Sequence, residues 1–194
     1  MTMSKFIYSY FSSIIVLVFL VALIMFPAST FSKISTDGVK FESSYGFDWP
    51  IPGYVNISSY FGRRNSPTAG ASSYHSGIDI PAPEGTPVIA IDDGIVYFAG
   101  WGAGGGYTIS IQLTKTEYKL SYCHLSPIMF VSTNQTVMKG EIIGTVGPKN
   151  VYGIQNNPYK DSNGNPTNGA TTGCHLHFTI KLNDKAVDPL FYYE

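Results

Sequence analysis

Cysteine and charged side chains are scarce in this sequence of 194 residues. The two cysteines are too few for a scaffold held together by several disulfide bonds. The 12 basic and 13 acidic residues give a net charge of -1, so no basic face indicates nucleic acid as a partner. Tyr, Phe, Gly, Ser, Thr and Asn are plentiful instead, which favours an extracellular protein rich in β-strands with neutral polar loops.

An uncharged apolar run covers residues 6–28 and follows Lys5. Its length matches the roughly 20 apolar residues of a helix that spans a bilayer. A cleaved signal peptide is the alternative, but its apolar region is usually shorter, about 7–15 residues, and Pro27-Ala28-Ser29-Thr30 is a poor match to its cleavage site. We therefore predict that residues 1–28 form a transmembrane anchor, or a signal segment, and that the remainder is exported: membrane-anchored and extracytoplasmic, or secreted.

The remainder of the chain is predicted to be a stalk followed by one all-β domain. Residues 29–48 have no periodic apolar face and are interpreted as a stalk. From Trp49 to residue 194, short runs rich in Val, Ile, Tyr and Thr alternate with Gly, Pro and Asn, and no stretch carries a sustained helical period. The predicted strands are 88–91, 94–99, 107–113, 118–124, 141–146 and 175–182.

All four histidines lie in three short clusters: His75 four residues before Asp79, His124 at the end of a predicted strand, and His175 with His177. Histidine is both a common zinc ligand and the side chain best suited to proton transfer near neutral pH. Two histidines and one aspartate would make a zinc site with an open position, which is typical of catalysis. Two histidines would remain to move protons.

Strand geometry places His175 and His177 on one face, because side chains alternate along a strand. Each cluster alone has a simpler interpretation: strand histidines can face solvent, and Asp79 can occupy a turn. The combination of all three is the stronger signal. A segment rich in Asn, Gly and Pro, 147–173, is predicted to be a long loop that forms a wall of this site.

Several separated motifs follow one another from Trp49 to Phe178: Trp49-Pro-Ile-Pro-Gly, Ser59-Tyr-Phe-Gly-Arg-Arg64, His75-Ser-Gly-Ile-Asp79 continuing to Val88, Ala90-Ile-Asp-Asp-Gly-Ile-Val96, Gly106-Tyr-Thr-Ile-Ser-Ile111, Tyr122-Cys-His-Leu-Ser126, Gly140-Glu-Ile-Ile-Gly144 and Cys174-His-Leu-His-Phe178. In order and spacing, these motifs resemble those of the lysostaphin-like (LytM-type) zinc metallopeptidases.

The resemblance implies a compact antiparallel β-sandwich or barrel-like domain with one zinc in a groove. It implies that the substrate is peptidoglycan, cut at a peptide bond in the stem peptides or the cross-bridges. His75, Asp79 and His177 would be the zinc ligands, and His124 and His175 the catalytic histidines. Zinc-activated water would attack the carbonyl while one histidine takes a proton.

The sequence departs from the family at the loop before the last motif, which is longer, and at Cys123 and Cys174, where small residues or proline are common. Strand alternation turns both cysteines away from the metal face, and they are either a disulfide or a pair of buried free thiols. Some members use a tyrosine near the site, and Tyr74 and Tyr122 lie nearby. The alternative function is a non-catalytic wall-binding or hydrolase-regulating module, although all five site positions are intact.

Overall fold

The computed structural model describes residues 43–193. They belong to a compact unit that begins at Gly38. The predicted anchor at 1–28 and most of the predicted stalk lie outside the described residues. Within 43–193, no helix has the length and apolar character needed to cross a membrane.

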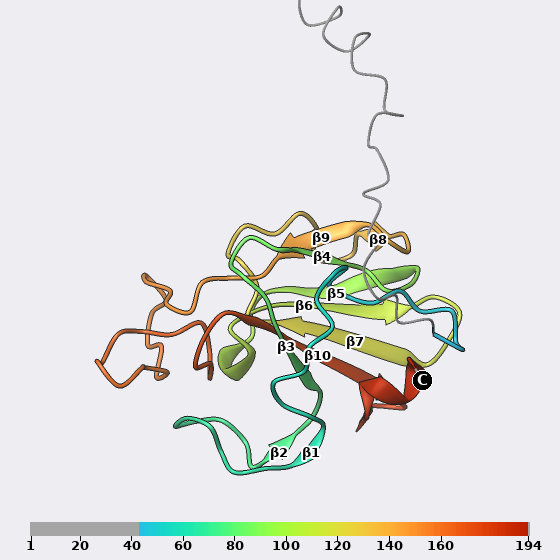
Figure 1. Cartoon of the computed structure of the whole chain (residues 1–194). Coiled ribbons are helices and arrows are strands. Elements are labelled where there is room, and N and C mark those ends of the chain that lie inside the picture. Colours follow the sequence, from blue (N-terminus) through green and yellow to red (C-terminus); the bar gives the residue numbers. More distant parts are fainter. Residues whose placement is uncertain (1–42, 194) are drawn as a thin grey trace, which may run out of the picture. The chain divides into compact units, whose positions relative to one another are not determined.

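One seven-stranded antiparallel sheet dominates the domain (Figure 1). Its strands run in the order β11-β10-β7-β6-β5-β8, and β3 pairs with β10 beside β11. Two further pairs, β4 with β9 and β1 with β2, complete the strands. The bounds are β1 (Gly62–Arg63), β2 (Tyr74–His75), β3 (Ile78–Pro81), β4 (Pro87–Ile89), β5 (Gly94–Trp101), β6 (Tyr107–Leu113), β7 (Tyr118–Cys123), β8 (Thr136–Val137), β9 (Ile142–Thr145), β10 (His175–Leu182) and β11 (Lys185–Val187).

Helix is limited to two short 3-10 segments in the described part of the chain, η2 (Ala103–Gly105) and η3 (Pro189–Tyr192). The prediction of an all-β domain is therefore confirmed. Of the six predicted strands, 107–113 and 175–182 have the observed bounds, and the others differ by one or two residues at one or both ends. The short strands β1, β2, β3, β8 and β11 were not predicted.

Alternation along the strands gives the large sheet one apolar and one polar face. In β10, Phe178 and Ile180 are fully buried, and Phe178 lies opposite Tyr122 of β7. The β4–β9 pair covers this apolar face: Gly144 of β9 lies against the side chain of Ile109 in β6. The core thus lies between two unequal layers, and the opposite, polar face of β10 carries the histidines.

Residues before the first strand also contribute to the core. Phe47, near the end of the segment interpreted as a stalk, is buried and packs edge-on against Tyr118. Trp49 is buried too and contacts Tyr193 edge-on. These aromatic contacts attach both ends of the described chain to the same core.

Candidate metal centre and histidine pair

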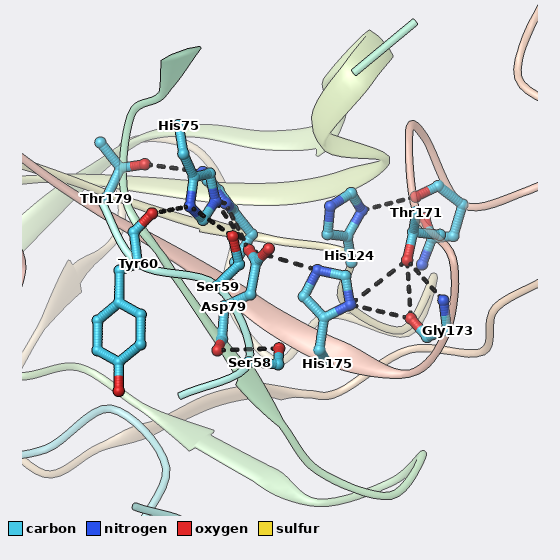
Figure 2. Close-up of polar contacts among 12 residues, drawn as sticks. Ser58, Ser59, Tyr60, His75, Asp79, His124, Thr171, Gly173, His175 and Thr179 are labelled. Atoms are coloured by element: carbon cyan, nitrogen blue, oxygen red, sulfur yellow. Dashed lines mark hydrogen bonds and ion pairs between the residues drawn. The ribbon is translucent and has the colours of Figure 1, made fainter. Parts of the chain in front are cut away.

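His75, Asp79 and His177 converge on one point. Figure 2 shows the contact between His75 and Asp79 and, beside it, His124 and His175. Asp79 and His177 are directly opposite in the β3–β10 pair, so their side chains share a face. Asp79 Oδ1 lies 3.0 Å from His75 Nε2 and 2.9 Å from His177 Nδ1, and the two nitrogens are 2.8 Å apart. Gly77 permits this approach, because a Cβ there would lie 2.1 Å from the Phe178 carbonyl oxygen.

The hydrogen bonds of the two imidazoles leave lone pairs that point at the shared position. His75 Nδ1 lies 2.9 Å from the Tyr60 carbonyl oxygen, which can only accept, so Nδ1 carries the proton and Nε2 does not. His177 Nε2 lies 3.0 Å from the Thr179 hydroxyl, which can accept its proton and leave Nδ1 as a lone-pair donor. Two neutral imidazoles and a carboxylate are a donor set that suits zinc with an open coordination position. The residues therefore fit the metal.

Arg64 fixes the orientation of the ligand carboxylate. Its Nη1 donates to Asp79 Oδ2 at 3.0 Å and also to the Ser59 hydroxyl, so Oδ1 is left to face the histidines. Burial alone would raise the pKa of Asp79, but the side chains of His175, His177 and His75 around the carboxylate outweigh burial and hold that pKa well below its usual range. The carboxylate is therefore ionised and positioned for a cation.

His124 and His175 lie side by side, with ring centroids 4.8 Å apart. His124 Nδ1 donates to the Asn168 carbonyl oxygen at 2.7 Å, and His175 Nδ1 donates to the Gly173 carbonyl oxygen at 3.0 Å. Both Nε2 atoms are consequently free of a proton in the neutral rings. Burial lowers the pKa of His124 to about 3, with help from the neighbouring histidines, so this ring is a neutral proton acceptor.

The predicted side-chain directions around His124 were wrong. Strand β7 ends at Cys123, and His124 has a φ of 60°, which breaks the alternation. Cys123 lies opposite His177 in the β7–β10 pair and shares its face, so it lines the groove and does not turn away from it. Cys123 and Cys174 are both free thiols in the structure. The disulfide alternative is therefore not the one observed.

The loop 147–173 holds the two histidines through its backbone and borders the groove at Ala170. Asp161 organises its distal part, where Oδ1 accepts from the backbone N–H groups of Asn163 and Asn165. Burial raises the pKa of Asp161, but these bonds outweigh it and bring the pKa to about 2.

Asn168 fastens the same loop to the sheet. Its side-chain Oδ1 accepts from the Tyr107 N–H and its Nδ2 donates to the Leu125 carbonyl oxygen, each at 2.9 Å. The loop is thus an ordered wall of the site, as its sequence predicted.

A groove of about 360 Å³ runs over the polar face beside these residues. It is lined in part by His75, His124 and His177. Tyr74 also lines it and is half exposed. Tyr122, in contrast, is fully buried in the core, and its hydroxyl accepts from the Ile91 N–H. Of the two nearby tyrosines, only Tyr74 can reach a bound peptide.

The structure thus brings all five predicted site residues together, three around one point and two beside it. Sequence reasoning did not assign a task to Arg64 or Asn168. Arg64 is the last residue of a motif included in the resemblance, and this position could have indicated its role. The Asn168 contact to His124 uses a backbone carbonyl, for which the side-chain sequence carries no signal.

A convergent His/Asp/His set beside two histidines on an antiparallel sheet defines a metallopeptidase-type site. The sequence profile of Peptidase family M23 matches residues 73–189, and the chain belongs to this family. Its mostly β architecture matches that of solved family members. The catalytic domain of lysostaphin from Staphylococcus simulans has a TM-score of 0.56 at 29% identity, covering 72% of this chain and 92% of that domain. A zinc-containing peptidase from Vibrio cholerae has a TM-score of 0.57 at 29% identity, covering 74% of this chain and 39% of that one.

Curated relatives match most of the chain. The DD-carboxypeptidase/endopeptidase Mpg of Neisseria meningitidis serogroup B is 34% identical over 154 residues, which is 79% of this chain and 31% of that protein. The peptidoglycan DD-endopeptidase ShyC of Vibrio cholerae is 32% identical over 131 residues, 67% of this chain and 25% of that protein. The chain thus spans a third or less of the length of these two relatives.

Proposed function

We propose that the chain is a zinc-dependent endopeptidase that hydrolyses peptide bonds in bacterial peptidoglycan. The observation that carries this proposal is the convergence of His75 Nε2, Asp79 Oδ1 and His177 Nδ1 beside a second pair of histidines whose Nε2 atoms carry no proton in the neutral rings. Relatives named as peptidoglycan DD-endopeptidases support the choice of substrate.

The roles of the residues follow from their hydrogen bonds. Bound zinc would supply Lewis acidity that activates water and polarises a carbonyl. One of the two unprotonated Nε2 atoms, of His124 or His175, accepts the proton of the attacking water, and the pair returns a proton to the leaving amine. Their Nδ1–H groups donate to the Asn168 and Gly173 carbonyl oxygens, which fix the rings and stabilise the positive charge of the protonated form.

The test is digestion of purified peptidoglycan with the full-length, zinc-loaded chain, followed by mass spectrometry of the released fragments. New amino and carboxyl termini at a peptide bond are expected, and they should be absent with a chelator or with the variant His175→Ala. Binding to peptidoglycan without new termini would contradict the proposal and favour a non-catalytic wall-binding module.

The proposal includes a location: an anchor at 1–28 that places the peptidase domain on the outer side of the membrane. The uncharged apolar run of residues 6–28 supports it. The intact chain should fractionate with membranes and be open to protease added from outside. A mature protein that begins near Ser29 would show secretion instead.

A further inference from the structure

The groove beside the histidines contains fixed positive charge and no acidic lining residue. Its lining includes Arg64 and Lys181, and neither Asp nor Glu is among the groove-lining residues of the described chain. The positive charge of Arg64 is paired with the Asp79 carboxylate. Lys181 adds a second positive charge, which forms no salt bridge among residues 43–193.

Lys181 differs in this respect from its neighbour on the sheet. It lies on β10 directly opposite Lys119 of β7, so the two side chains share a face. Lys119 is neutralised by an ion pair with Asp184. Lys181 forms no salt bridge among residues 43–193, but it acts through space on Asp184, the carboxylate already paired with Lys119, so that one carboxylate serves two lysines. Two ammonium groups that share one carboxylate leave a net positive charge, which attracts an anion from solution.

A polar track connects Lys181 to the metal centre. Thr179 and Ser121 lie opposite one another between Lys181 and His177, and both line the groove. His177 and Lys181 are four residues apart on one strand, so their Cα atoms are about 13 Å apart at the usual rise of a strand. An extended peptide bound along this track would place a residue near Lys181 within a few residues of the bond at the metal.

We propose that Lys181 binds a carboxylate of the substrate peptide, so that the groove selects anionic peptides over neutral ones. This inference rests on the proposed function and narrows it. Stem peptides of peptidoglycan carry free carboxylates, whereas a cross-bridge made of glycine alone has none along its length. The charge of the groove therefore assigns stem peptides as the substrate class.

The experiment compares two synthetic stem peptides that differ only in a free carboxylate or its carboxamide, with the full-length, zinc-loaded chain. The wild type should cleave the acid with a kcat/KM about tenfold above that of the amide, mainly through KM, since an ion pair remote from the reacting atoms acts on binding. Lys181→Gln should lose this preference and Lys181→Arg should keep most of it. Lys185→Gln, an exposed lysine of β11 outside the groove lining, is the matched control and should behave like the wild type.

A binding measurement separates this inference from the proposed function. In the His175→Ala background, titration calorimetry should give a Kd for the acid peptide about tenfold lower than for the amide, and Lys181→Gln should remove the difference. Equal kcat/KM and equal Kd for the two peptides in the wild-type groove would overturn the role of Lys181 while cleavage itself upholds the proposed function. Tight, Lys181-dependent binding of the acid peptide without cleavage by the wild type would contradict the proposed enzymatic function and support the carboxylate-binding role of Lys181.

Discussion

Replacing Asn168 by alanine should destabilise the domain by about 2–4 kcal/mol. The side chain is fully buried, and it pairs the Tyr107 N–H and the Leu125 carbonyl oxygen. Each buried polar group left without a partner costs about 1–3 kcal/mol, and the carbonyl is the more tolerant of the two. Asn168→Asp should be at least as harmful, because it puts a carboxylate oxygen against the Leu125 carbonyl oxygen.

The assay is equilibrium unfolding in urea of the metal-free segment 38–194, with the midpoint shifted and the slope unchanged. Asn163→Ala is the matched control in the same loop, because this side chain is exposed, and it should change the free energy of unfolding by less than about 0.5 kcal/mol. Asn168→Ala should also lower turnover, since the Asn168 carbonyl orients His124. A loss below about 1 kcal/mol, or one equal to that of Asn163→Ala, would refute this reasoning.

Three further predictions follow from the same geometry. His124→Ala should lower kcat about 10²–10⁴-fold and retain zinc, whereas His177→Ala should lose the metal. Equal zinc release from both variants would show that the assignment of His124 to proton transfer and His177 to metal binding is wrong. Arg64→Gln should weaken zinc binding about 10–100-fold in a competition titration with a chelating dye, while the exposed Arg63→Gln should not; no difference between the two would contradict the positioning role. The loop 147–173 should become open to pepsin as the pH falls from 4 toward 2. Because the pKa of Asp161 is depressed, the ionised carboxylate stabilises the fold fully above pH 3.8, and this stabilisation is lost as the pH falls through about 2. A pepsin cleavage rate that does not change over this range, relative to a denatured control, would contradict the prediction.

The part of the fold that alternation specifies was predictable from the sequence. Strands β6 and β10 alternate apolar and polar residues over seven and eight positions, which is long enough for period two to be read. The same alternation placed His175 and His177 on one face. Strands β1 and β2 have two residues each, too few for any period to show.

The part of the site that depends on backbone conformation was not predictable. His124 continues the alternation of β7 in the sequence, yet its positive φ redirects the side chain into the groove. Its backbone is held by bonds to Gly105 and Gly147, from distant parts of the chain. A single non-glycine residue in this conformation has no local signature, because tertiary hydrogen bonds impose it.

The central claim is that one metal ion held by His75, Asp79 and His177 makes this chain a peptidoglycan hydrolase. Its most direct test is a titration of the chelator-treated, full-length chain with zinc, in which cleavage of peptidoglycan and bound metal are measured together. Activity should rise in proportion to bound zinc and reach its maximum at one ion per chain. Full activity at much less than one zinc per chain, or no activity at one, would contradict the account.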